Sequence, residues 1–116
     1  MTVEITRAEI IEWMLDDAPA SCNYWVRNGT YDGGRFEITE TVDDWVESHG
    51  PIIITHEVLE KAITNWCIHH AKGHGYDYFD TFAKDWMWGD YGAVDYDAEV
   101  VDQIVQWAAF GEIRYG

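Results

Sequence analysis

The chain has few basic residues. Seven Lys and Arg stand against 22 Asp and Glu in 116 residues, which gives a formal charge of −15 at pH 7 and a pI near 4.3. A surface of that sign repels the phosphates of nucleic acids and the headgroups of anionic lipids. We therefore expect neither direct nucleic-acid binding nor membrane-surface binding, and we expect a protein partner to present a basic surface.

Long apolar runs and cysteines are also scarce. The longest run of large aliphatic residues is Ile52–Ile54, whereas a membrane helix needs about 20 apolar positions. Residues 1–17 lack the basic start and the apolar stretch of a secretory signal. We expect a cytoplasmic protein in which Cys22 and Cys67, too far apart in sequence for a redox pair, are buried thiols.

The apolar and aromatic contents, 47% and 16% of the residues, are those of a folded domain. The first predicted element is a helix over residues 7–18. Thr6 and Glu9 form a capping box before it, apolar residues then recur at helical spacing, and Pro19 is expected to end it.

Two further amphipathic helices are expected in the middle of the chain. Thr55 is a candidate N-cap for a helix over residues 56–72, which should end at Gly73. Its apolar stripe consists of Leu59, Ala62, Ile63, Trp66 and His70. Residues 77–88 place another set on one face, namely Phe79, Phe82, Ala83 and Trp86.

A last helix is expected after Asp95 or Asp97, either of which can serve as its N-cap, and should end at Gly111. Its stripe consists of Val101, Ile104, Val105 and Ala108. The four residues 112–115 alternate as a short strand does.

The remaining strands are expected to form a hairpin over residues 24–41. Asn28-Gly29 and Asp32-Gly33-Gly34 are turn sequences, and Phe36 and Ile38 alternate with polar residues. Residues 42–50 are acidic and irregular, and residues 51–55 are a short apolar run. The sequence therefore predicts one α+β domain over residues 1–116, a short antiparallel sheet packed by about four helices.

Two segments are similar to a known pattern. They are Asn23-Tyr24-Trp25 and the run from Asp95 to Gly116, in which Ile104-Val105-Gln106 is followed by Phe110-Gly111-Glu112 and Tyr115-Gly116. They resemble small accessory proteins of tailed bacteriophages, whose C-terminal pattern covers about a fifth of this chain. The chain departs from that family at Ser21-Cys22, where the family has two glycines. The resemblance implies a phage gene expressed in the cytoplasm of an infected bacterium, and it implies no activity.

Acidic residues are concentrated between positions 77 and 102, where Lys84 is the only base. If the helices turn their apolar stripes inward, these acids share an outer surface. Trp88, which lies off the stripe of its helix, is expected on the same surface. The predicted partner-binding residues are Asp77, Asp80, Asp85, Trp88, Asp90, Asp95, Asp97, Glu99 and Asp102. Such a face can imitate a nucleic-acid duplex to a host defence or nucleic-acid-handling protein and inhibit it. Alternatively, it is a solvated face that keeps the protein soluble.

Seven tryptophans are many for a chain of this length, and Trp45 falls in the acidic irregular segment. An alternative hypothesis is a small-molecule binder that sequesters a host nucleotide signal, with exposed aromatic rings for the base and cations for the phosphates. The residues for that alternative are Tyr24, Trp25, Arg27, Arg35 and Arg114. Otherwise the tryptophans fill the core around a small sheet.

Enzymatic and metal chemistry have little support in the sequence. Cys67, His70 and His74 have a spacing that could ligate zinc, but a closed site needs a fourth ligand, for which only Asp77, His56 or Cys22 remain. Neither a nucleophile-elbow pattern nor a phosphate-binding loop is present. We expect no enzyme, no cofactor and no bound metal. The oligomeric state is left open by the sequence, a homodimer included.

Overall fold

The first helix begins where the capping box predicts. In the computed structural model, which describes residues 4–71 and 77–116, α1 spans Arg7–Ser21. The Thr6 hydroxyl accepts the N–H of Glu9 at 3.2 Å, and the Glu9 carboxylate accepts the N–H of Thr6 at 3.1 Å. The prediction that Pro19 ends the helix is wrong. The helix continues past Pro19, and its last turn closes with Cys22 N–H on the Ala18 carbonyl at 3.0 Å.

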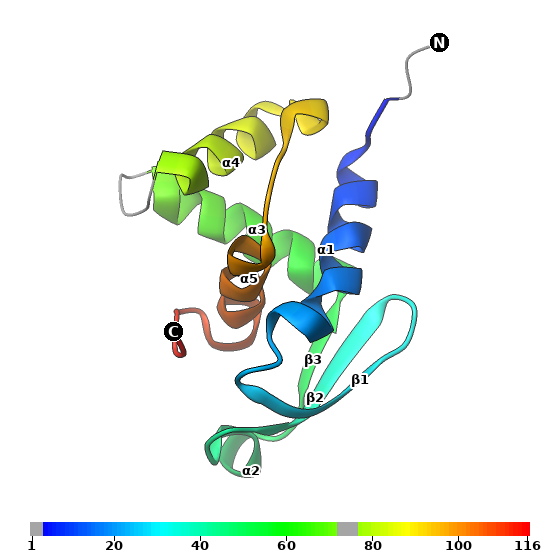
Figure 1. Cartoon of the computed structure of the whole chain (residues 1–116), viewed down its shortest axis with the longest axis vertical. Helices are drawn as coiled ribbons and strands as arrows, with labels where there is room; N and C mark the ends of the chain where they lie inside the picture. Colours follow the sequence, from blue (N-terminus) through cyan, green and yellow to red (C-terminus); the bar gives the residue numbers. More distant parts are fainter. Residues whose placement is uncertain (1–3, 72–76) are drawn as a thin grey trace.

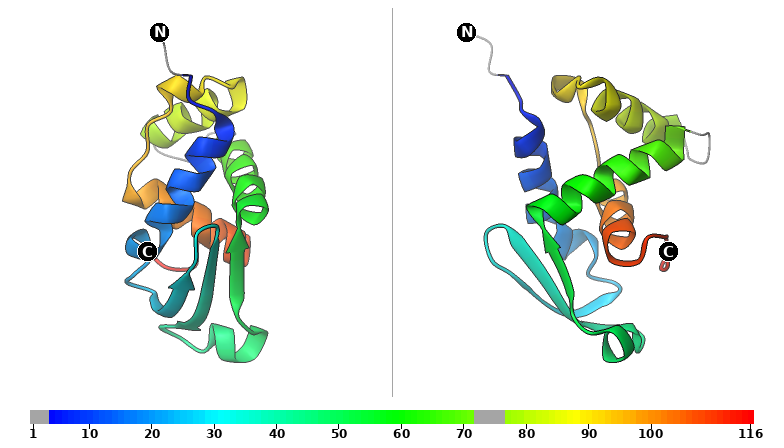
Figure 2. Two further views of the ribbon diagram at one scale, coloured as in Figure 1. Left: turned by 90° about the vertical axis from the view of Figure 1, so that its right-hand side faces the viewer. Right: turned by 180° about the vertical axis from the view of Figure 1, so that it is seen from behind.

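The two middle helices agree with their predicted spacing. The α3 helix spans His56–Ala71 and begins with the Thr55 hydroxyl accepting the N–H of Val58 at 3.3 Å. All five residues of its predicted stripe are buried, as are the four of α4, which spans Asp77–Trp88. The two helices pack side by side in both Figure 1 and Figure 2. The predicted end at Gly73 lies outside the described residues.

The last helix, α5, spans Ala98–Phe110 and follows the 3₁₀ turn η1, Tyr91–Ala93. Asp97 rather than Asp95 is its N-cap, and accepts the N–H of Val100 at 3.1 Å. Gly111 ends the helix with φ 71°, as predicted. Its stripe turns inward, with Val101, Ile104 and Val105 buried and Ala108 half-buried.

Within the described residues one sheet forms, from β1 (Val26–Tyr31), β2 (Arg35–Thr41) and β3 (Ile52–Thr55) in that order, all antiparallel. The turn at Asp32-Gly33-Gly34 is confirmed, with Asp32 N–H bonded to the Arg35 carbonyl at 3.0 Å. The buried face of the sheet is built by Phe36, Ile38, Ile52 and Ile54. Helix α1 lies against β1 and β2, and α5 lies against β3.

Two predictions about the hairpin region are wrong. Asn28-Gly29 is no turn but lies inside β1, where the register with β2 shifts as at a β-bulge. Residues 42–50 are not wholly irregular, because a short helix, α2, spans Trp45–His49. Its first N–H, that of Trp45, is bonded to the carboxylate of Asp43 at 3.1 Å.

The sheet and α2 form one end of the molecule, while α4 and η1 form the opposite end, with α1, α3 and α5 between them (Figures 1 and 2). A single hydrophobic cluster runs through these elements. The α+β prediction with a short antiparallel sheet is confirmed. None of the helices in residues 4–71 and 77–116 combines the length and apolar character that a bilayer crossing requires.

Gly29 provides a test of the hairpin packing. A Cβ atom at this position would lie 2.9 Å from Cε1 of Phe36, whose side chain is buried. We expect Gly29→Ala to lower the free energy of unfolding by about 1–3 kcal/mol through overpacking. Gly34→Ala is the control, since a Cβ there meets no atom within 4 Å. Equal stability of the two variants in chemical denaturation would contradict this packing.

Candidate functional site

Asp102, predicted as an outer-surface acid, is buried, with 8% of its surface exposed. The prediction is wrong because α5 turns this carboxylate toward the segment between α1 and β1. It accepts hydrogen bonds from Trp25 Nε1 at 2.7 Å, from the Tyr24 hydroxyl at 2.5 Å and from Gln106 Nε2 at 3.1 Å. Three donors compensate the cost of removing a carboxylate from water, so Asp102 is part of the interior.

Cys22 lies beside this carboxylate. Burial raises the pKa of its thiol well above the usual range, and the negative charge of Asp102 raises it further. Burial likewise raises the pKa of Cys67 to about 12. Both thiols are free and buried, which confirms the predicted burial, and both stay protonated near neutral pH. A protonated thiol is a poor nucleophile and a poor metal ligand.

Gln106 extends the network from Asp102 to the C-terminal segment. Its Oε1 accepts the N–H groups of Arg114 and Tyr115 at 2.8 and 2.7 Å, and its Nε2 donates to the Tyr115 carbonyl at 3.0 Å. The strand predicted at 112–115 is therefore wrong. A side-chain amide, rather than a neighbouring strand, satisfies the backbone of this segment.

Asp43 holds the same segment from the other side. Its carboxylate accepts the Tyr115 hydroxyl at 2.9 Å and Arg114 Nη2 at 3.0 Å. Desolvation raises the pKa of Asp43, but the hydrogen bonds from Trp45 N–H, Tyr115 and Arg114 outweigh it and lower the pKa to about 2. The carboxylate therefore stays ionised at neutral and mildly acidic pH.

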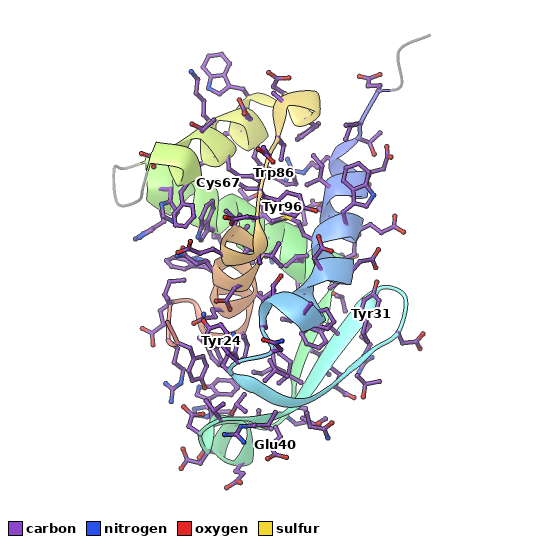
Figure 3. The ribbon with its side chains drawn as sticks, viewed as in Figure 1. Tyr24, Tyr31, Glu40, Cys67, Trp86 and Tyr96 are labelled. Carbon is purple, nitrogen blue, oxygen red and sulfur yellow. The ribbon has the colours of Figure 1, made fainter. Side chains whose placement is uncertain are left out.

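Aromatic packing completes the attachment. The Tyr115 ring stacks on Trp25 with centroids 5.1 Å apart and an interplanar angle of 15°, and Phe110 packs edgewise against Tyr115 at 5.6 Å. Figure 3 shows Tyr24 on the chain between α1 and β1, beside α5. Five residues of the segments 23–25 and 104–116 thus contact one another, namely Tyr24, Trp25, Gln106, Phe110 and Tyr115. We name this set, with Asp102 and Asp43, the C-terminal clamp.

Tyr24, Trp25 and Arg114 of the alternative nucleotide site lie around Tyr115, while Arg27 and Arg35 lie on β1 and β2. Trp25 is 0% exposed and already stacked on Tyr115, so its ring offers no face to a base. Arg114 is paired with Asp43, and Arg35 with Glu37 at 3.4 Å. Arg27 is exposed on β1, and Tyr24 is exposed but donates its hydroxyl to Asp102. Trp25 and Arg114 are therefore engaged within the fold, whereas Tyr24, Arg27 and Arg35 keep exposed side chains.

The remaining predicted acids lie on α4, in the chain that follows it and at the start of α5. Four of them are exposed between the end of α4 and the first turn of α5, namely Asp90, Asp95, Asp97 and Glu99. Asp80 and Asp85 are half-buried on α4, and the side chain of Asp77 lies outside the described residues. Trp88 is 81% exposed, as predicted from its place off the stripe. Trp45, from the acidic segment, packs its ring against Phe110 at 4.9 Å and is half-buried.

The histidine cluster is only partly described. His70 is buried and lies between Trp66 and Phe79, with ring centroids 4.1 and 5.4 Å away, as its place on the stripe predicts. His74 lies outside the described residues. Across residues 4–71 and 77–116 no group of three His, Cys, Asp or Glu side chains is placed to hold a metal ion.

Comparison with known proteins gives no match, whether the chain is set against protein-family models, curated proteins or solved structures. The charge, exposure and contacts of the described residues are therefore the basis for a functional proposal.

The clamp is tested at Asp102. Asp102→Ala leaves the buried N–H of Trp25 without its acceptor, so we expect the free energy of unfolding to fall by roughly 2–3 kcal/mol. Asp102→Asn keeps one acceptor oxygen and should lose less. The exposed Asp95→Ala should stay within about 0.5 kcal/mol of wild type. If Asp102→Ala unfolds at the same denaturant concentration as Asp95→Ala, the buried hydrogen bonds contribute nothing measurable.

Proposed function

We propose that this chain is a non-enzymatic accessory protein of a tailed bacteriophage. It binds and inhibits a host protein that has a basic surface, in the cytoplasm of the infected bacterium. The host protein is a defence or nucleic-acid-handling factor, to which the acidic surface presents itself as a nucleic-acid mimic. The resemblance of residues 23–25 and 104–116 to phage accessory proteins supports the phage origin.

One observation carries the binding proposal. An exposed tryptophan, Trp88, stands directly before a segment in which Asp90, Asp95, Asp97 and Glu99 are all exposed. Large apolar side chains in contact with water mark interaction sites when they are rimmed by polar groups, and tryptophan is enriched among the residues that dominate binding energy. We name this set, with Asp85, the acidic surface.

The inner side of the same elements fixes the acidic surface in place. The α4 side chains Phe79, Phe82 and Trp86 are buried. Figure 3 shows Trp86 on the side of α4 that faces the body of the molecule. Tyr96 donates its hydroxyl to Asp17 on α1 at 3.3 Å, and Asp97 is held as the α5 cap. The carboxylates therefore sit on anchored backbone, which limits the conformational entropy lost on binding.

Electrostatics explain the choice of partner. A net charge of −15 repels nucleic acids and attracts basic protein surfaces over distances of about a Debye length, roughly 8 Å at physiological salt. Proteins that handle nucleic acids carry such surfaces to bind phosphates. Occupation of that surface by carboxylates blocks the nucleic acid without any chemical reaction, which is why no catalytic group is needed.

The acidic surface is tested by neutralising it. We expect the combined changes Asp85→Asn, Asp90→Asn, Asp95→Asn and Glu99→Gln to reduce capture of basic proteins from a bacterial lysate on the order of tenfold, because each exposed ion pair contributes about 0.2–1 kcal/mol. Capture is quantified by mass spectrometry at several salt concentrations, and thermal melting checks the fold.

The matched control removes the same charge elsewhere, through Glu12→Gln, Glu40→Gln, Glu47→Gln and Glu57→Gln, all exposed positions on other elements. It should retain most of the capture. If both quadruple variants lose capture equally, capture depends on the net charge of the protein and not on the acidic surface. If neither does, the protein does not bind through acids at all, and the proposal is wrong.

A further inference from the structure

The exposed end of α4 is an apolar patch within an acidic region. Trp88 is 81% exposed and its neighbour Met87 is 50% exposed. Among residues 4–71 and 77–116, no aromatic ring or cation contacts the Trp88 ring. A tryptophan in this position exposes a large apolar area that the fold itself does not use.

The backbone turns sharply after Trp88, and the turn is closed by two backbone hydrogen bonds to α4. Gly89 has φ 76°, a left-handed conformation that glycine adopts without strain. The Gly89 N–H then bonds to the Trp86 carbonyl at 3.2 Å, and the Asp90 N–H bonds to the Asp85 carbonyl at 2.9 Å. Asp90 is thereby held against the last turn of α4, on which Asp85 also lies.

The C-terminal end of α4 also favours a cation. The C-terminus of a helix carries a partial negative charge, and cations are favoured there. The last turn of α4 contains no basic residue to neutralise it. Trp88 is the last residue of this helix, three residues after Asp85 and two before Asp90, and the face of an indole ring itself attracts cations.

The inner side of α4 already shows which cation such a ring accommodates. The guanidinium of Arg7 lies over the Trp86 ring, 4.6 Å from its centroid. Its Nη2 donates to the Thr64 hydroxyl at 3.2 Å and its Nη1 to the Tyr91 hydroxyl at 3.4 Å. A planar guanidinium can therefore stack on a tryptophan of this helix and still use its N–H groups at the rim.

We propose that Met87 and Trp88 dock an arginine of the partner protein, with the guanidinium stacked on the indole and hydrogen-bonded to the carboxylate of Asp85 or Asp90. This rests on the proposed function and specifies its chemistry. Arginine fits better than lysine because it is planar, less strongly hydrated and able to donate several hydrogen bonds while stacked. A second copy of the chain is a poor occupant, since its charge of −15 repels the first.

The test compares two synthetic peptides of equal length and charge, one with four arginines and one with four lysines separated by alanine. Calorimetry at low salt measures both against wild type, Trp88→Ala, Trp88→Phe and the control Trp13→Ala, whose side chain on α1 is 41% exposed. We expect wild type to bind the arginine peptide about fivefold more tightly than the lysine peptide. Trp88→Ala should abolish that preference, Trp88→Phe should retain part of it, and Trp13→Ala should retain it in full.

The possible failures are distinguishable. If wild type binds both peptides equally, or if Trp88→Ala keeps the arginine preference, the arginine site is wrong while binding of a basic protein surface stands. If Trp88→Ala instead converts a dimer to a monomer in sedimentation, a second copy occupies the patch and the inference is also overturned. Failure of the lysate capture described above would overturn the proposed function itself.

Discussion

The fold depends on one buried carboxylate. Asp102 on α5 accepts the indole N–H of Trp25 and the hydroxyl of Tyr24, and so ties the last helix to the chain between α1 and β1. Gln106, one turn later, carries the same network to the backbone of Arg114 and Tyr115. Each partner matters because a buried charge or amide without hydrogen bonds costs more than the bond itself contributes.

On the proposed function, the clamp maintains the fold and the acidic surface binds the partner. Tyr24, Trp25 and Tyr115 contact one another in the clamp near the sheet. The exposed Trp88 lies at the end of α4, away from the sheet (Figure 1), and the acids after it follow the chain from there to the start of α5.

The sequence predicted the helices well because their stripes are local and periodic. The faces of α3, α4 and α5, the capping box of α1 and the Gly111 cap all follow from spacing within single elements. The clamp could not be predicted in this way, since Asp102 and Trp25 are 77 positions apart and only the fold joins them. One feature of the sequence did point to the clamp. Asp102 and Gln106 are one helical turn apart and adjoin the apolar stripe, which indicates that both polar side chains face the interior and need hydrogen-bond partners there.

The most direct test of the clamp is hydrogen exchange of the tryptophan indole N–H groups, followed by NMR. The indole of Trp25, 0% exposed and 2.7 Å from the Asp102 carboxylate, should exchange among the slowest of the seven, and that of Trp88 should exchange at once. Addition of the arginine peptide should shift the Trp88 signal and leave that of Trp25 in place. Rapid exchange at Trp25, with a rate like that of Trp88, would contradict the buried carboxylate on which this structure depends.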